Sequence, residues 1–571
     1  MRDGTLVGGK SFGYKRLRIL CWCAAIAFGA VDAWATRHNM NLDGISYLDM
    51  GDAYLRGDWN MAINAYWSPL YSWLLGITLK VLKPAPQWEF PVVHLVNFVI
   101  YLAALASFDF FVCALIDYRR KRGSGAGNGW DVSLPERSWW ILGYSLFIWT
   151  SLILIGTKLV TPDMFVAAFV YLAAGLLLRA RGGTATWRTF VLFGAVLGFG
   201  YLAKAVMFPL AFVFLAVATF TFGNTWKAEP RILISTLIFL SIASPLIVAL
   251  SHAKGRLTFG DSARVNYEIY VDGVDWSIPN GNGLTHPVKK IVEAPAPPTY
   301  EFGKPIGGTY PLWYDTSYWH EGIKPRFDLK GQLQAIKEAL FLYYLTFFSQ
   351  FLQLNVSAGF LMLCALGAPR SLCLKTGPAV WPLVILALSA LGLYSLVHVE
   401  WRFIGAFVCL LWLGAFSLVR LPAARDAKRL IAGVIIAIAA TTCLSGVWWI
   451  NQRDPESGPA YWEAARALNE KGIRPGDKVA VVGSNGPALE GVAYLARLAR
   501  IQIVAQVNEP DGFRTADSST QSQVTEAIAR TGAKAILTFP EPPLSPESQW
   551  QRLGNTNYYT HLLTPTASWL E

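Results

Sequence analysis

Charged residues are scarce in this sequence. Asp, Glu, Lys and Arg together make up 15% of the 571 residues, against about a quarter in soluble globular chains. Hydrophobic residues account for 53%, and the mean hydropathy is +0.35. This balance excludes an ordinary soluble enzyme. Short segments of alternating polarity are missing too, which excludes a closed membrane barrel and leaves a helical membrane protein.

Cysteine is scarce as well, with seven residues and no Cys-x-x-Cys pair. All seven fall in predicted membrane spans or in the basic turns between them. We therefore expect neither a disulfide framework nor a metal site built on cysteine pairs. The seven are Cys21, Cys23, Cys113, Cys364, Cys373, Cys409 and Cys443.

Long apolar runs, in contrast, recur along most of the chain. Each is near the 20 or so residues that a helix needs to cross about 30 Å of hydrocarbon. The pattern predicts about eleven transmembrane helices, and we do not expect the first to be a cleaved signal peptide, because no small-residue cleavage site follows it. The predicted spans are 18–36, 92–116, 138–157, 162–179, 189–203, 205–223, 232–251, 337–366, 377–397, 402–419 and 429–450.

The positive net charge of +11 indicates topology, and no nucleic acid partner is expected. Lys and Arg gather in alternate loops that fall on one side of the membrane, and the positive-inside rule makes that side cytoplasmic. The N-terminus is then cytoplasmic, while loops 37–91 and 252–336 and everything after residue 450 face the periplasm of a bacterial inner membrane. The basic segments are 10–18, 119–122, 179–188, 227–231, 370–375 and 420–429.

The composition changes near residue 450, which divides the chain into a membrane domain, 1–450, and a soluble domain, 451–571. In the soluble part, helix-like runs alternate with KVAVVG at 478–483, IQIVAQV at 501–507 and AKAILTF at 533–539. This alternation predicts a small α/β periplasmic domain with a mainly parallel sheet. The turn GSNG between strand and helix suits either a phosphate cradle or a structural cap.

Three carboxylates, Asp43, Asp49 and Asp52, follow the first span directly. Carboxylates at the mouth of a membrane protein are costly, so they indicate chemistry. Asp43 suits a general base at the outer membrane surface, and the alternative is an N-cap of the next helix. Asp49 and Asp52 lie three apart on that helix and share a face, which suits either function or solvation.

Charges also mark three outward turns elsewhere. Asp163 opens a later span, where the helix dipole favours a carboxylate. Lys204 ends a helical hairpin, where a lysine either snorkels or holds a phosphate. His398, Glu400 and Arg402 stand within five residues of each other, and they suit either a phosphate contact or a local ion pair.

All these turns lie on one predicted side of the membrane, with carboxylates in one and cations in two others. Transfer from a negatively charged lipid donor needs this combination, because cations stabilise the leaving phosphate and a base takes the proton of the acceptor. Phosphoryl transfer from nucleotides is not expected, since the sequence has no Walker or kinase motif.

The order of these motifs resembles the GT-C integral-membrane glycosyltransferases, in particular the protein O-mannosyltransferase and aminoarabinose-transferase branch (glycosyltransferase family 39). The resemblance covers roughly residues 15–420. The motifs that carry it are Asp43-x-x-x-Tyr47 with Gly57-Asp58-Trp59, Tyr66-Trp67-Ser68-Pro69-Leu70, Thr161-Pro162-Asp163, Gly200-Tyr-Leu-Ala-Lys204 and Glu400-x-Arg402-Phe403.

The resemblance implies an α-helical polytopic, GT-C-like fold and an inverting glycosyltransferase. Such an enzyme moves a sugar from a polyprenyl-phosphate donor to a lipid, glycan or protein acceptor of the envelope. Asp43 is then the base, and Lys204 and Arg402 bind the donor phosphate. The supporting residues are Tyr47, Asp49, Asp52, Asp163, His398 and Glu400. The alternative for the last three is a divalent metal ion site.

The sequence departs from the family pattern at two positions. Gly44 stands where the family has an acid beside the base, and Ser68 stands where it has a lysine. Phosphate binding then depends more on the other cations. In the long loop, several side chains suit contacts to the sugar or acceptor, although Trp and Tyr also suit an interfacial belt. These loop residues are Trp313, Tyr314, Asp315 and His320.

Two other functions stay open from the sequence: a transporter or flippase of lipid-linked saccharide, and a non-catalytic subunit of an envelope-polymer assembly. Transporters place charges along the middle of their spans and show repeated halves. Here the charges gather at one face, and the two halves of the membrane part do not match. The pattern favours the enzyme.

Overall fold

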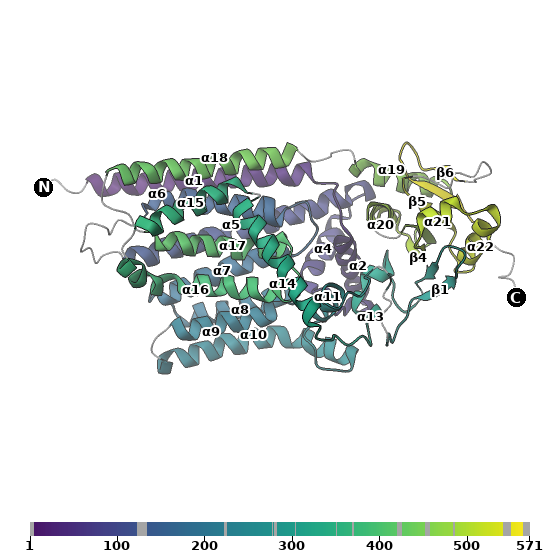
Figure 1. Cartoon of the computed structure of the whole chain (residues 1–571), viewed down its shortest axis with the longest axis horizontal. Coiled ribbons are helices and arrows are strands. Elements are labelled where there is room, and N and C mark those ends of the chain that lie inside the picture. Colours follow the sequence, from purple (N-terminus) through teal and green to yellow (C-terminus); the bar gives the residue numbers. More distant parts are fainter. Residues whose placement is uncertain are drawn as a thin grey trace.

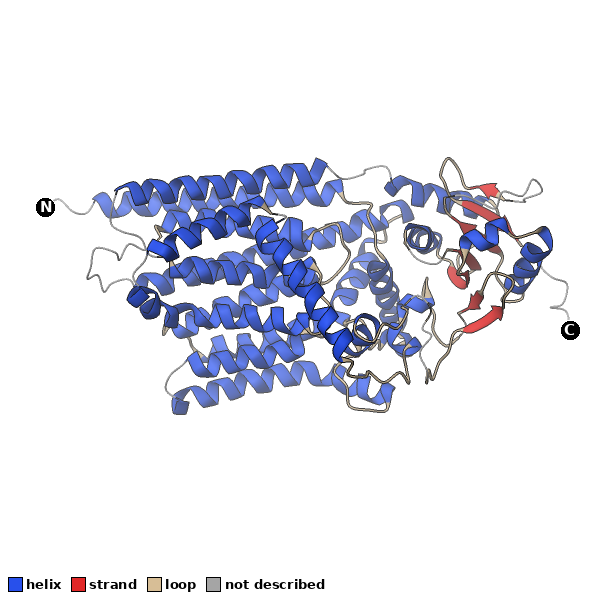
Figure 2. Ribbon diagram, viewed as in Figure 1, coloured by secondary structure: helices blue, strands red, loops and turns tan. Residues whose placement is uncertain are grey.

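The computed structural model consists of a bundle of long helices with a mixed sheet at one end (Figures 1 and 2). We call this the sheet end of the bundle, and the opposite end, where α1 begins, the far end. The structure describes residues 5–122, 134–221, 225–276, 278, 283–302, 304–349, 351–367, 370–419, 425–451, 457–483, 486–540 and 550–563.

Within these residues, seven helices are long and apolar enough to cross a membrane, and a pair bent by 80° makes an eighth. Their apolar surface faces outward as well as inward: the apolar window of Glu229–Lys254 is only 17% buried within the protein. The seven are Lys15–Ala35, Pro86–Lys121, Glu136–Ile155, Asp163–Arg181, Glu229–Lys254, Trp401–Leu418 and Arg429–Trp449, and the bent pair is Leu329–Ser349 with Leu352–Cys364.

The predicted polytopic helical fold is confirmed, and each of the eleven predicted spans coincides with a helix in the described part of the chain. Eight correspond to the segments above. The other three coincide with apolar helices of 10–17 residues, Trp187–Ala203, Met207–Thr221 and Trp381–Ser395. A fourth short apolar helix, Pro69–Leu82, lies in the loop predicted at 37–91.

The helices of the bundle run between the two ends, and shorter helices gather at the sheet end (Figure 1). The bundle helices are α1 (Thr5–Ala35), α5 (Glu89–Arg122), α6 (Glu136–Trp149), α7 (Asp163–Arg181), α8 (Trp187–Ala203), α9 (Met207–Thr221), α10 (Thr225–Lys254), α14 (Leu329–Tyr344), α15 (Leu352–Gly367), α16 (Arg370–Ser395), α17 (Trp401–Leu418) and α18 (Arg425–Asn451). The shorter ones are α2 (Leu42–Arg56), α3 (Trp59–Ala62), α4 (Pro69–Leu82), α11 (Ser262–Tyr270), α12 (Pro311–Tyr314) and α13 (Thr316–Trp319).

Within the described residues, the sheet has seven strands in the order β1-β2-β4-β3-β5-β7-β6. Only its centre is parallel, where β3 pairs with β4 and β5; the prediction of a mainly parallel sheet is wrong for the four strands at the edges. The strands are β1 (Lys289–Val292), β2 (Thr299–Glu301), β3 (Lys478–Val482), β4 (Gln502–Val507), β5 (Ala535–Thr538), β6 (Gln551–Arg552) and β7 (Tyr559–Leu562).

β1 and β2 come from the loop 252–336, in which we predicted no strand. β2 pairs antiparallel with β4, so the loop becomes part of the sheet of the C-terminal domain. β3 is buried along four of its five residues, as an apolar strand covered on both faces is. The helices of this domain are α19 (Ser457–Glu470), α20 (Pro487–Ala499), α21 (Pro510–Thr515) and α22 (Ser518–Ala529).

Arg497 of α20 ties the C-terminal domain to the bundle. Its guanidinium donates hydrogen bonds to Asp49 and Asp52, both at 2.7 Å, and to Glu89 at 2.8 Å, and its side chain is 4% exposed. Arg500 places a second cation on Glu89. Buried charges lose hydration that only close pairing offsets. The network therefore specifies one docking position of α20 against α2 and the start of α5.

Replacing Arg497 with methionine leaves Glu89 and Asp49 buried without their main cation. We expect the free energy of unfolding of the purified chain in detergent to fall by about 3–5 kcal/mol. Arg466→Met is the matched control, because Arg466 is exposed on α19 and pairs only loosely with Glu470, at 3.6 Å; it should change stability by no more than about 0.5 kcal/mol. Equal, small effects of both substitutions would contradict a docking role for the network.

Candidate functional site

Asp43 lies in the first turn of α2, at the sheet end of the bundle. The N-cap of this helix is Asn41, whose side chain accepts a hydrogen bond from the backbone N–H of Val160 instead of capping. The N-cap alternative for Asp43 is therefore excluded. Its two carboxylate oxygens accept hydrogen bonds from Trp313 Nε1 at 3.2 Å and from Arg402 at 2.8 Å.

Arg402, in the first turn of α17, holds three carboxylates together. Its guanidinium contacts Asp43 at 2.8 Å, Glu400 at 2.7 Å and Asp163 at 3.9 Å. These acids come from α2, from the turn before α17 and from the start of α7. Of the two sequence-based alternatives for Arg402, the local ion pair with Glu400 is present, and the phosphate contact stays a prediction. Arg402 also reaches the predicted base, Asp43.

Lys204 adds the second cation to this cluster. It ends α8 and places its ammonium 2.5 Å from a carboxylate oxygen of Asp163 and 3.6 Å from the centre of the Phe403 ring. The side chain is mostly buried, 22% exposed, and therefore does not snorkel to the surface. Asp163 is 3% exposed; its other carboxylate oxygen is buried and accepts no hydrogen bond in the described structure.

Close packing around Gly44 explains one departure from the family pattern. A Cβ atom at this position would lie 2.6 Å from Cβ of Val160 and 2.7 Å from the sulfur of Met40. A second carboxylate beside Asp43 therefore does not fit. The absence of a side chain lets α2 approach the segment before α7, which brings Asp43 to Arg402.

The cluster opens into a cavity of about 330 Å³, a volume typical of small-ligand sites. Four aromatic side chains contribute to its wall, and Trp276 and Trp313 lie with their rings 5.0 Å apart. Flat aromatic walls combined with a few polar groups suit a sugar ring. The polar and aromatic lining residues are Asn41, Asp43, Tyr66, Asn266, Tyr270, Trp276, Trp313, Glu400, Arg402 and Glu490.

His398 stacks face to face on Tyr270, with 3.7 Å between the ring centres. Its Nε2 lies 3.6 Å from Glu400. Burial opposes ionisation of Glu400, but the hydrogen bond from His398 and the guanidinium of Arg402 outweigh it and lower the pKa to about 2. Burial, together with the negative charges of Glu400 and Asp43, raises the pKa of Tyr270. The cavity thus presents an ionised carboxylate next to neutral phenols.

Three predicted supporting residues lie away from the cavity. Asp49 and Asp52 face the opposite side of α2 and bind Arg497; Asp49 also accepts hydrogen bonds from Thr309 and is 7% exposed, so it is not a solvated residue. Tyr47 is buried and does not line the cavity; its ring centre lies 5.1 Å from that of Trp67.

The loop residues predicted to contact substrate also divide into one that lines the cavity and three that do not. Trp313 lines the cavity, whereas the next three residues have structural partners. Tyr314 donates its hydroxyl proton to the carbonyl of Met61, Asp315 caps α13, and His320 is fully buried against Glu268 at 3.2 Å. Of the four loop residues that we predicted to contact substrate, only Trp313 lines the cavity.

Five of the ten polar and aromatic lining residues were not predicted from the sequence: Asn41, Asn266, Tyr270, Trp276 and Glu490. Glu490 belongs to α20, so the C-terminal domain forms part of the cavity wall. Its carboxylate accepts a hydrogen bond from Tyr494 at 2.9 Å. Only the excess of aromatic residues in the loop 252–336 hinted at Tyr270 and Trp276. Of the turn GSNG, which we predicted to be a phosphate cradle or a structural cap, only Gly483 and Gly486 belong to the described residues. Both alternatives therefore stay open.

The carboxylates of this cluster do not form a fitting divalent metal site. Among the described residues, no three His, Cys, Asp or Glu side chains come together in a metal-binding arrangement. Arg402 and Lys204 stand beside Asp43, Glu400 and Asp163, where their positive charges would repel a divalent ion.

Comparison with known proteins shows the fold. The sequence matches no protein-family model and no curated protein sequence. The structure is similar to the crystal structure of ArnT from Cupriavidus metallidurans in the apo state, with a TM-score of 0.51 and 12% identity over 94% of this chain and 97% of that chain. The fold of this chain is therefore similar to that of ArnT, as the resemblance inferred from the motifs predicted.

Two further solved structures give lower scores. ArnT from Cupriavidus metallidurans bound to undecaprenyl phosphate has a TM-score of 0.49 and 12% identity over 96% of this chain and 98% of that chain. The Archaeoglobus fulgidus oligosaccharyltransferase complex with Zn and sulfate has a TM-score of 0.48 and 12% identity over 91% of this chain and 67% of that chain.

The lowered pKa of Glu400 predicts a pH dependence. A folded-state pKa of about 2 against an ordinary value of 4.5 means that the ionised form favours folding above pH 4.5 and that this contribution disappears as the pH falls from 4.5 to 2. The stability difference between wild type and Glu400→Gln should therefore be constant above about pH 5.5 and shrink below it. Denaturant unfolding between pH 3 and 7 measures it. A stability difference that stays constant across this pH range would contradict the lowered pKa of Glu400.

Proposed function

We propose that this protein is an inverting glycosyltransferase that moves a sugar from a polyprenyl-phosphate donor to an acceptor hydroxyl of the cell envelope. The observation that carries the proposal is the pairing of Asp43 with Arg402 at the wall of a cavity that also has aromatic lining residues. Lys204 lies behind this wall and joins the cluster through Asp163, which contacts both cations. The fold shared with ArnT and the order of the sequence motifs support the same class of enzyme.

In this proposal, Asp43 acts as the general base. The acceptor oxygen attacks the anomeric carbon on the face opposite the phosphate, and its proton passes to the carboxylate of Asp43. The bond between the anomeric carbon and the phosphate oxygen breaks, and the polyprenyl phosphate leaves with the electron pair. Trp313 and Arg402 each donate one hydrogen bond to Asp43, which fixes its orientation and leaves lone pairs available.

Arg402 and Lys204 would stabilise the negative charge that develops on the leaving phosphate. Before the donor binds, Arg402 is engaged by Asp43 at 2.8 Å. A phosphate that takes over this guanidinium would release Asp43, so binding of the donor would free the base. Three carboxylates face two cations in this cluster, which explains why donor and Asp43 compete for the same positive charge.

The arrangement in the membrane follows from charge. Lys121, Arg179 and Arg188 line a pocket at the far end of the bundle, as expected for the cytoplasmic side. We therefore place the far end and the N-terminus in the cytoplasm, and the cavity with the C-terminal domain at the periplasmic face of a bacterial inner membrane. There the cavity opens where a lipid-linked donor and an envelope acceptor meet.

Asp43→Asn should lower the rate of sugar transfer by about 10²–10⁴-fold, because the amide cannot take a proton. The assay uses the purified full-length chain in nanodiscs, a panel of radiolabelled polyprenyl-phosphate sugars and an envelope fraction as the source of acceptors. Asp58→Asn is the matched control: Asp58 caps α3 in the same segment, and asparagine caps equally well. Transfer by Asp43→Asn at the wild-type rate would refute the mechanism.

Competition for Arg402 gives a separate prediction for donor binding. Asp43→Asn should bind a polyprenyl phosphate at least as tightly as wild type, because the rival anion is gone, whereas Arg402→Gln should bind it at least tenfold more weakly. Binding is measured in nanodiscs with a fluorescent polyprenyl phosphate. Weaker binding in both variants would contradict the exchange of Arg402 between Asp43 and the phosphate.

A further inference from the structure

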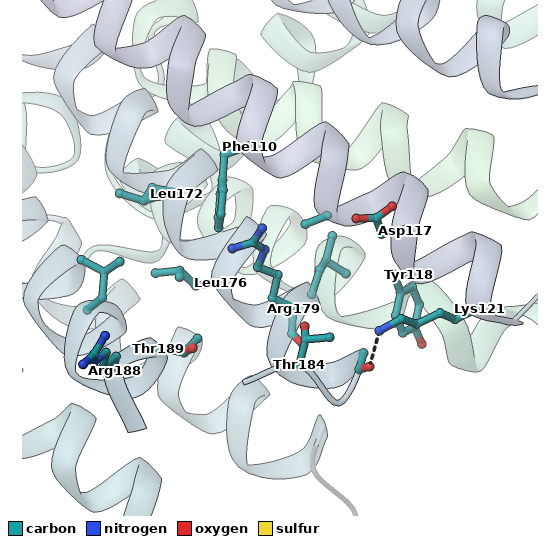
Figure 3. A pocket seen from close by; sticks show the side chains of 14 residues that line it. Phe110, Asp117, Tyr118, Lys121, Leu172, Leu176, Arg179, Thr184, Arg188 and Thr189 are labelled. Carbon is teal, nitrogen blue, oxygen red and sulfur yellow. Dashed lines mark hydrogen bonds between the residues drawn. The ribbon is translucent and has the colours of Figure 1, made fainter. Parts of the chain in front are cut away.

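A second cavity, of about 480 Å³, lies at the far end of the bundle. Side chains of α5, α7, α8 and the α7–α8 turn line it (Figure 3). Its walls include Phe110, Leu172, Leu176 and Leu192, and Leu192 is 46% exposed. The volume and the apolar lining are typical of a site for a small organic ligand. The proposed transfer reaction does not use this cavity.

Three cations line the same cavity: Lys121, Arg179 and Arg188. In Figure 3, Arg179 is drawn between the other two. Among the described residues, none of the three forms an ion pair with a carboxylate, and the one acid of the lining, Asp117, pairs with Arg120 at 3.8 Å. The cavity therefore carries an excess of positive charge.

The local packing holds two of these cations in place. The guanidinium of Arg179 stacks on the Phe110 ring, 4.6 Å from its centre, which fixes its plane and leaves its N–H edge available. Lys121 donates a hydrogen bond to the carbonyl of Gly182 at 3.0 Å, shown by the dashed line in Figure 3. An ammonium has three donors, so Lys121 keeps two for a ligand.

The place of the cavity in the bundle indicates the source of its ligand. Asp163 begins α7 beside Arg402 of the first cavity, and Arg179 lies sixteen residues further along the same helix, about 24 Å away at the rise of an α-helix. The second cavity thus lies near the opposite surface of the bilayer. Cations there meet lipid headgroups, and the exposed leucine lies where acyl chains run.

We infer that this cavity binds an anionic phospholipid of the leaflet at the far end of the bundle. The phosphate lies between Arg179 and Arg188, Lys121 contacts the headgroup, and one acyl chain follows Leu176 and Leu192. Basic pockets between transmembrane helices on the cytoplasmic side take anionic lipid headgroups in this way. The inference does not depend on the proposed transfer reaction.

The test measures lipid binding to the full-length chain in detergent, with short-chain phosphatidylglycerol as the probe. We expect saturable binding of phosphatidylglycerol and at least tenfold weaker binding of phosphatidylcholine. The double variant Arg179→Ala/Arg188→Ala should lose at least tenfold in affinity for phosphatidylglycerol, because each cation near the surface contributes to anion attraction. Lys15→Ala is the matched control, since it removes an exposed cation of α1 near the same end without lining the cavity; it should bind like wild type.

Two further measurements separate the sources of the phosphate. Inorganic phosphate at the same concentration should not displace the lipid; displacement would identify a soluble phosphate as the ligand and overturn the inference. Leu176→Trp, which fills part of the apolar lining and leaves all three cations in the sequence, should also weaken lipid binding. Equal affinity of wild type and the double arginine variant, with thermal unfolding unchanged, would overturn the inference as well.

Discussion

The ion pairs of Arg402 are the interaction on which the site depends. Three carboxylates from separate parts of the chain lie around one guanidinium, and in the mostly buried cluster each alone would be costly to ionise. The cation therefore requires α2, α7 and the turn before α17 to meet at one point. This requirement places the start of α2 against the segment before α7. The two segments are so close at Gly44 that no larger side chain fits at this position.

A second guanidinium acts in the same way on the other side of α2. Arg497 holds Asp49 and Asp52 together with Glu89, so one short helix links the cavity beside Arg402 on one face to the C-terminal domain on the other. The strands β1 and β2 strengthen this connection, because the loop that carries Trp313 is also part of the sheet. The C-terminal domain thus supports the cavity wall and contributes Glu490 to it.

Much of the fold and part of the site were predictable. Apolar length is a local property, so the helical spans and their approximate bounds followed from the sequence, and the motif order identified the residues that meet at Arg402. The partners of each carboxylate were less accessible. Asp43, Asp49 and Asp52 look alike along the chain, yet only Asp43 faces the cavity, because the helical period turns the other two toward Arg497.

The sequence by itself determined that the chain spans a membrane and which end of the bundle carries the basic residues. It also determined where Asp43, Lys204 and Arg402 fall relative to the spans. Each of these properties depends on composition within a few helical turns. Only the tertiary structure decided that Tyr270, Trp276 and Glu490 complete the cavity and that Tyr314, Asp315 and His320 do not. Those assignments depend on contacts between segments hundreds of residues apart, and the periodicity of a single segment holds no information about its distant partner.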